Sequence, residues 1–268
     1  MTQPGDLPPL RELGLDLLVV SRRQRMVSLA SPFAWCAAYF VLAAFDYWLA
    51  AGLALVALSF VTYGSVSHDL VHRNLGLPTW LNDLLLCAIE LIALRSGHAY
   101  QAAHLHHHAR FPHPDDVEAA VASQSLLGAL TEGVLGQFRI GWWALKNAKR
   151  SRTWIIGEVL ACMVLVSGAA LSYWFAPTLL IYAVLMVTGS WVIPLVTSYL
   201  PHDPDGPTEL LRTRAFRGVV ASILAMEHLY HLEHHLYPSV PHHHWPKLAK
   251  RLDPYLERAG VKPIRLWF

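Results

Sequence analysis

Charged residues and cysteines are scarce in this chain. Of its 268 residues, 15% are charged and 54% are hydrophobic, and the mean hydropathy is +0.34. So low a charge content excludes an ordinary soluble domain and predicts one integral membrane domain over residues 1–268. The three cysteines, Cys36, Cys87 and Cys162, lie far apart in apolar runs. This placement is typical of small buried thiols rather than of a disulfide framework or a cysteine metal site.

Two further features are missing. The 21 Lys and Arg residues nearly balance the 19 Asp and Glu residues, and no basic stripe is interleaved with aromatic residues. We therefore expect no nucleic-acid partner. Residues 1–20 lack a basic region followed by a hydrophobic core and a small-residue cleavage site, so we expect no removable signal peptide.

Four apolar stretches are long enough, or nearly so, to cross a bilayer as helices, which takes about 20 residues. They cover residues 29–47, 49–66, 153–174 and 177–199. The sequence therefore predicts an all-α integral membrane protein with four transmembrane helices in two hairpins. Every Lys and Arg lies at or before Arg25, between Arg73 and Arg152, or from Arg212 onward. The positive-inside rule then places both termini and the central segment in the cytoplasm, and the protein in the inner or plasma membrane if the source is bacterial.

A fifth apolar stretch, residues 80–94, carries Asp83 and Glu90 and is short for a full crossing. We interpret it as an interfacial or re-entrant helix. A full crossing there, or at residues 215–226, would put the histidine clusters described next on opposite sides of the membrane.

Histidine is abundant, with 16 residues, and much of it lies in three clusters just outside the apolar stretches. Residues three and four apart share a helix face, so each cluster directs its imidazoles to one side. A buried imidazole needs a polar partner, and so many of them in one region indicate metal binding. The clusters are HDLVH with His68 and His72, HLHHH with His104, His107 and His108, and HLEHH with His231, His234 and His235.

The number of histidines exceeds what one ion needs. A structural zinc takes four ligands and usually includes cysteine, so this set favours a dinuclear centre. Neutral imidazole suits iron, zinc, copper and nickel alike. Iron is favoured because it can activate O2 as a co-substrate once two electrons arrive, with the active face on the cytoplasmic side.

Two other functions fit a histidine-rich membrane protein. A metal transporter usually holds its ion near the bilayer midplane, and a haem-binding electron carrier needs facing histidines on separate spans. The apolar stretches at 29–66 and 153–199 contain no histidine, which argues against both. The transporter remains a remote alternative.

The three clusters, in this order and separated by an apolar pair of stretches, resemble the histidine boxes of the membrane fatty acid desaturase superfamily over roughly residues 60 to 250. This resemblance implies four membrane helices capped by a cytoplasmic helical domain that holds a di-iron site with two Fe ions. It also implies a further ligand, His202 in SYLPHDP. The implied set is then nine: His68, His72, His104, His107, His108, His202, His231, His234 and His235.

The substrate class is less sharply marked. YLPH before HLEHHLYPSVP, and HLHHH followed closely by PHPDD, are similar to bacterial carotenoid ring hydroxylases and ketolases. Acyl desaturases also carry EHHLYPSVP, so a fatty acyl desaturase is the alternative. Either substrate is a membrane-dissolved hydrocarbon, a lipid or a carotenoid. The sequence contains no cytochrome b5 segment, so we expect a separate electron donor such as ferredoxin or a cytochrome.

Other polar residues near the boxes are candidates for roles around the ligands. His228 could be an additional ligand or stack against one, and Asp69 and Glu233 could accept the second N–H of a ligating imidazole. Asp115, Asp116 and Glu118 are weaker candidates for that role. His106 lies between ligands and points about 100° from its neighbours, so we do not expect it to be a ligand. The other histidines are expected at the surface or interface rather than on a metal: His98, His113, His242, His243 and His244.

Overall fold

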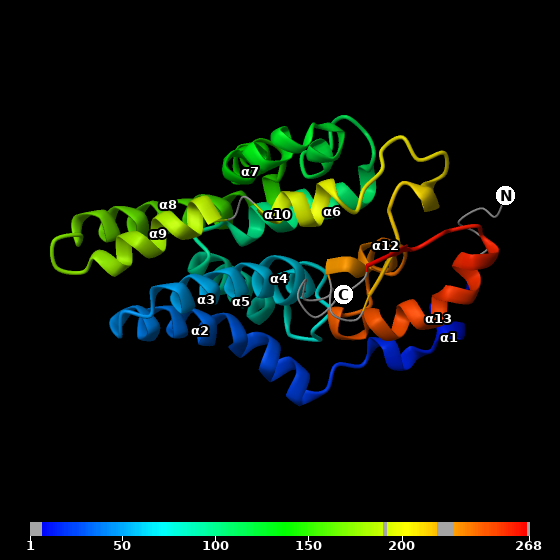
Figure 1. The fold of residues 1–268 in the computed structure, drawn as a ribbon, viewed down its shortest axis with the longest axis horizontal. Helices are drawn as coiled ribbons and strands as arrows, with labels where there is room; N and C mark the ends of the chain where they lie inside the picture. Colours follow the sequence, from blue (N-terminus) through cyan, green and yellow to red (C-terminus); the bar gives the residue numbers. More distant parts are fainter. Residues whose placement is uncertain (1–6, 190–191, 219–227, 267–268) are drawn as a thin grey trace.

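The computed structural model describes residues 7–189, 192–218 and 228–266, and these residues are mostly helical. Figure 1 shows two pairs of long helices, α2 with α3 and α8 with α9, extending to one side, and shorter helices gathered at the other. The elements before the first histidine box are α1 (Leu10–Leu13), η2 (Leu15–Leu18), α2 (Arg22–Ala44), α3 (Trp48–Val61) and η3 (Thr62–Val66). The central elements are α4 (Ser67–Val71), α5 (Thr79–Ile92), α6 (Gly97–Arg110), η4 (Ala119–Ser123), α7 (Leu126–Asn147) and η5 (Lys149–Ser151).

The remaining elements follow in chain order. They are α8 (Arg152–Leu171), α9 (Pro177–Gly189), α10 (Val192–Pro194), η6 (Leu195–Tyr199), η7 (Glu209–Leu211), β1 (Phe216–Arg217), η8 (His228–Tyr230), α12 (His231–Leu236), η9 (His242–His244), α13 (Trp245–Arg258) and β2 (Ile264–Arg265). The two short strands, β1 and β2, pair in parallel.

Within the described parts of the chain, three helical segments are long and apolar enough to cross a membrane: Leu15–Ala44, Trp48–Val71 and Lys149–Leu171. In Lys149–Leu171, only 17% of the apolar 18-residue stretch is buried within the protein. Its outward side chains, such as Val164 at 69% exposure, therefore form a surface suited to lipid. These segments correspond to the first three apolar stretches that the sequence indicates.

The fourth expected span stays a prediction. Within the described residues, α9 is a shorter apolar helix of 13 residues, and α10 and η6 follow it. Residues 190–191, which lie inside the expected span, are outside the described residues. Most of 215–226 is outside them as well, from residue 219 onward.

The stretch at 80–94 forms α5, which has 14 residues and is too short for a full crossing. Its end is fixed by a buried ion pair, because Nε of Arg95 lies 2.7 Å from Oε2 of Glu90. The guanidinium of Arg95 also donates to the Thr62 hydroxyl at 2.7 Å. This polar contact ties α5 to the end of α3.

Two π-helical turns, η3 and η6, come just before predicted metal ligands. Such turns add a residue to the helical repeat and often occur at functional sites because they redirect the side chains that follow. The η3 turn leads into α4 and the first histidine box, and η6 leads to His202. Two apolar segments therefore each lead into the site through a π-helical turn.

The shorter helices share a separate core. Leu13, Leu17, Leu232, Trp245 and Leu248 belong to one buried apolar cluster that joins α1, η2, α12 and α13. The indole N–H of Trp245 donates to the carbonyl of Val240 at 2.9 Å. This packing fixes α12, which carries the third histidine box.

Candidate metal centre

The structure brings all nine predicted ligands together, and they divide into two groups. In each group the possible ligand atoms lie within 4.8 Å of one another. The five-histidine group contains His68, His72, His104, His108 and His234. The four-histidine group contains His107, His202, His231 and His235. Two metal positions side by side are what a dinuclear centre needs.

Helical spacing explains how the second and third boxes each serve both groups. On α6, His104 and His108 are four residues apart and join the five-histidine group, whereas His107 joins the other. On α12 the pairing is reversed, because His231 and His235 join the four-histidine group and His234 the other. His68 and His72 complete the larger group, and His202 from beyond η6 completes the smaller one.

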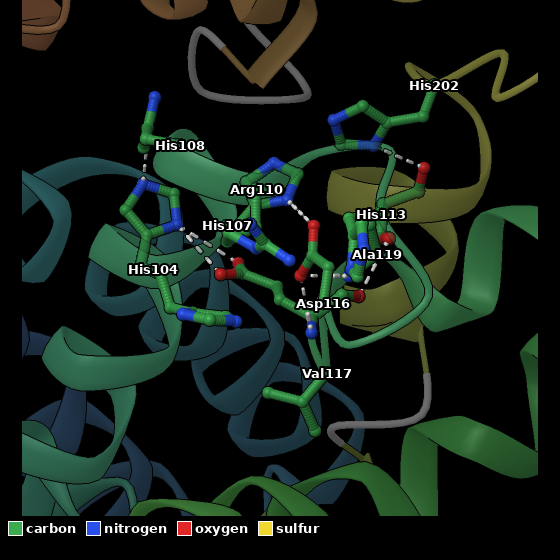
Figure 2. A network of polar contacts seen from close by, with 12 residues as sticks. His104, His107, His108, Arg110, His113, Asp116, Val117, Ala119 and His202 are labelled. Carbon is green, nitrogen blue, oxygen red and sulfur yellow. Dashed lines mark hydrogen bonds and ion pairs between the residues drawn. The ribbon is translucent and has the colours of Figure 1, made fainter. Parts of the chain in front are cut away.

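The Nδ1 atoms of three of these histidines are held by acceptors outside the cluster. Nδ1 of His107 lies 2.7 Å from Oδ2 of Asp116, and Figure 2 shows these two side chains directed toward one another. Nδ1 of His104 lies 3.0 Å from Oε2 of Glu118. Nδ1 of His202 lies 2.8 Å from the carbonyl oxygen of Ser198. When Nδ1 carries the proton in such a contact, Nε2 is left free to bind a metal.

The Nε2 atoms face one another at short distances. Nε2 of His68 lies 2.9 Å from that of His234, and Nε2 of His107 lies 3.1 Å from that of His235. Burial, together with neighbouring imidazoles, lowers the pKa of both His72 and His202 to about 3. These rings are therefore neutral at pH 7, which is the form that binds a metal.

The donor set fits metal ions rather than a network of hydrogen bonds alone. Nε2 of His72 is buried without a hydrogen-bond partner among the described residues. Neutral imidazoles packed Nε2 to Nε2 cannot all be satisfied by one another, because each ring has one donor and one acceptor. Two metal ions would remove that conflict.

His228 is not part of either group. Its Nε2 lies 3.3 Å from the carbonyl oxygen of Phe60, and its ring packs edge-on against the Phe60 ring with centroids 5.4 Å apart. The ring also occupies the space where a side chain on Gly64 would extend. The structure thus gives His228 a packing contact with η3 rather than the ligand position considered from the sequence.

Asp69 and Glu233 also differ from expectation. The Asp69 carboxylate accepts from the backbone N–H of His242 at 3.1 Å and lies 2.7 Å from its Nδ1. Glu233 forms an ion pair with Arg217 at 2.7 Å. These contacts involve residues outside both histidine groups, so these carboxylates connect the boxes to the rest of the chain.

Two of the three weaker candidates, Asp116 and Glu118, take the role expected of Asp69 and Glu233. The Asp116 carboxylate also accepts from the backbone N–H groups of Glu118 and Ala119, at 3.0 and 3.1 Å. Burial alone would raise the pKa of Asp116, but the hydrogen bond and charge of His107 outweigh burial and lower it. Asp115, by contrast, is exposed and pairs with Arg110 and His113.

Two histidines expected at the surface are buried. His98 is 2% exposed, with Nδ1 2.7 Å from Oε1 of Glu158, and His242 is 4% exposed against Asp69. Glu158 also accepts from the Ser96 hydroxyl at 2.6 Å and from the backbone N–H of His98 at 3.1 Å. These contacts fix the start of α6. None of His98, His106, His113, His242, His243 and His244 belongs to the histidine groups found among the described residues, as expected.

A buried tyrosine that the sequence did not single out as part of the metal site contacts it indirectly. The Tyr63 hydroxyl donates to Oε1 of Glu118 at 3.1 Å. Its ring stacks on that of Tyr100, with centroids 4.4 Å apart, and the Tyr100 hydroxyl donates to the Tyr63 carbonyl at 2.8 Å. The η3 turn thereby supports the carboxylate that orients His104.

A helical protein with apolar, membrane-length helices and two adjacent histidine groups has the architecture of a membrane histidine-box oxidoreductase. The fatty acid desaturase family model matches residues 45–267, so the chain belongs to that family, which is of the di-iron desaturase type. The match includes every histidine of both groups. No curated protein matches the chain.

Proposed function

We propose that this protein is an O2-dependent di-iron oxidoreductase that acts on a membrane-dissolved hydrocarbon, specifically a carotenoid ring hydroxylase or ketolase. The observation that carries the proposal is the division of nine buried or partly buried histidines into adjacent groups of five and four. Oxygen-activating chemistry needs two metal ions near each other, and family membership favours iron over the other metals that imidazole binds.

The chain itself would position and protect the reacting groups. His68, His72, His104, His108 and His234 would hold one iron, and His107, His202, His231 and His235 the other. Asp116 and Glu118 orient one imidazole of each group, and burial keeps bulk water away from His104 and His107, which are 2% and 1% exposed. When bound, the iron pair would supply the reductive activation of O2 that removal of hydrogen from an unactivated carbon requires.

The membrane arrangement belongs to the same proposal. Residues 1–268 form one membrane domain with four crossings in two hairpins, and α9, α10 and η6 together make the fourth. The basic residues up to Arg25, from Arg73 to Arg152, and from Arg212 onward support a cytoplasmic location for the histidines and both termini. A separate carrier, ferredoxin or a cytochrome, would deliver the two electrons there.

The choice of a carotenoid rests on the sequence around the boxes. YLPH at residues 199–202 and the close succession of HLHHH and PHPDD support it. The segment EHHLYPSVP, shared with acyl desaturases, supports a fatty acyl substrate equally well. A fatty acyl desaturase is therefore the second candidate, with the same metal centre.

A host that accumulates β-carotene and ordinary acyl lipids tests both candidates at once. The unmodified protein and its His234→Ala variant are compared by chromatography and mass spectrometry, with His113→Ala as control because His113 is exposed and outside both groups. Oxygenated carotenoids made by the unmodified protein and the control, but not by His234→Ala, support the proposal. New acyl double bonds with unchanged carotenoids would show that the substrate is a fatty acyl chain rather than a carotenoid. Activity in His234→Ala would overturn the assignment of the site.

A further inference from the structure

A groove of about 540 Å³ lies between α6, α7, α8 and α9, and its lining is mainly apolar. We call it the lateral groove. Its outer rim includes Phe138, Trp142 and Met163, which are 67%, 62% and 60% exposed. Met163 belongs to the membrane-length segment Lys149–Leu171. The rim therefore opens where lipid, rather than water, would surround the protein.

The inner end of the lateral groove approaches the metal centre. Gln137 and Ile140 line the groove and also line a smaller cavity of about 20 Å³. The wall of that smaller cavity includes Glu118 and Tyr63, and Glu118 contacts Nδ1 of His104. One turn of α7 thus separates a lipid-facing groove from a carboxylate that contacts a predicted ligand.

The charge of the groove bears on what can occupy it. Among the described residues that line the groove, the one cationic side chain is that of Arg95, which is 4% exposed and paired with the buried Glu90 carboxylate at 2.7 Å. Its charge is therefore compensated before any ligand arrives, so a carboxylate or phosphate group gains little there. Nη1 of Arg95 is buried and has no hydrogen-bond partner among the described residues. It can still donate to a neutral oxygen. Pockets that bind small molecules are commonly of this kind, largely apolar with few polar groups.

We propose that the lateral groove is the route by which an uncharged, elongated hydrocarbon enters from the bilayer and is held, and that Gln137 and Ile140 separate its outer part from the metal centre. This inference rests on the proposed function. A structural lipid chain is the alternative occupant. It would fill the groove without competing with substrate.

Gly141 allows the groove to be blocked with little strain. It lines the groove, and a Cβ added there meets nothing within 4 Å, so Gly141→Leu would place its side chain in open space. Gly157 on α8 has equally open surroundings but does not line the groove. Gly157→Leu is therefore a matched control. A second pair on α8 is Met163→Trp, which narrows the rim, and Leu165→Trp, whose position is exposed but outside the lining.

The test uses the full-length protein in bilayers and an uncharged long-chain alkane that carries a photoreactive diazirine. Labelled peptides are mapped by mass spectrometry with and without excess β-carotene or an acyl methyl ester, and the iron content of each variant is measured in parallel. We expect labelling of peptides from 134–145 and 159–167 that a competitor reduces at least about fivefold. We also expect Gly141→Leu and Met163→Trp to lose this protected labelling but to keep their iron. The controls Gly157→Leu and Leu165→Trp should keep both the protected labelling and the iron.

The outcomes separate the two proposals. Protection by the acyl ester alone keeps the groove as the substrate route and overturns the carotenoid assignment. Labelling that neither competitor reduces, or protected labelling that survives in both groove variants, overturns the groove as the route. That result leaves the metal centre to be judged by the His234→Ala experiment.

Discussion

Oε2 of Glu118 lies 3.0 Å from Nδ1 of His104, and two residues earlier Oδ2 of Asp116 lies 2.7 Å from Nδ1 of His107. His104 belongs to the five-histidine group and His107 to the four-histidine group. One short segment after α6 therefore orients an imidazole in each half of the centre. Carboxylates in this position fix the tautomer and ring orientation of a ligating histidine.

Asp116→Asn should weaken metal binding because a neutral amide oxygen is a weaker acceptor for the Nδ1–H of His107 than the charged carboxylate oxygen it replaces. We expect a loss of about 10- to 100-fold in iron affinity, the usual cost of removing such a partner. The measurement is iron per protein by mass spectrometry during titration with a chelator. Asp115→Asn is the control, because its side chain is 48% exposed whereas that of Asp116 is 1% exposed. Equal iron affinity in both variants would contradict the role given to Asp116.

Gly64→Ala should destabilise the fold. A Cβ at residue 64 would overlap the His228 ring, so either η3 or the ring must move. Overpacking of this kind typically costs about 1–3 kcal/mol. Unfolding in mixed micelles should show this loss, whereas Gly52→Ala, whose Cβ meets nothing within 4 Å on α3, should be neutral or stabilising.

The double variant Gly64→Ala with His228→Ala checks the cause. Removing the ring should recover part of the loss, so the two substitutions should be non-additive. If their effects simply add, the contact between Gly64 and His228 is not what limits residue 64 to glycine.

The sequence was informative wherever helical periodicity governs the outcome. Histidines three and four residues apart had to share a face, and the structure brings all nine together. The same geometry explains an error. Asp69 and Glu233 are each one residue from a predicted ligand, and adjacent residues on a helix point about 100° apart. A carboxylate adjacent to one ligand therefore points away from that imidazole, and here each carboxylate contacts a partner from a distant segment, His242 for Asp69 and Arg217 for Glu233.

Contacts between distant segments were not predictable in this way. The burial of His98 depends on Glu158, 60 residues later, and that of His242 on Asp69, 173 residues earlier. The roles of Asp116 and Glu118 depend on the path of the irregular chain after α6, for which no periodicity exists. In the fourth apolar stretch, the described residues form α9, α10 and the π-helical η6, a local change of helical repeat that no hydrophobic pattern indicates.

Asp69→Asn should mainly reduce stability. Asp69 joins the first histidine box to the start of η9 through two contacts with His242, and it is 0% exposed. Hydrogen bonds to a buried charged group contribute about 1.5–3 kcal/mol each. We expect a loss of that order in the unfolding free energy, with a smaller decrease in iron affinity than in Asp116→Asn.

The control for Asp69 is Asp83→Asn, which removes a surface pair with Arg73, whose side chain is 42% exposed. Exposed pairs contribute roughly 0–1 kcal/mol. A stability loss as large in Asp83→Asn as in Asp69→Asn would contradict the bridging role of Asp69.

Stability should fall as the pH decreases below about 6.5, and His228 should account for part of the change. Burial lowers the pKa of His228 to about 4 from an ordinary value of 6.5. Between these values the unfolded chain binds a proton that the folded protein does not, so unfolding is favoured as pH falls, and the effect levels off below pH 4. At about 1.36 kcal/mol per pH unit, His228 contributes roughly 2 kcal/mol between pH 6.5 and 5.

His228→Gln keeps a donor for the Phe60 carbonyl but cannot titrate, so its unfolding free energy should depend less steeply on pH by about that amount. His113→Gln, at an exposed position, should keep the slope of the unmodified protein. Identical slopes for all three proteins would show that His228 is not buried in its neutral form.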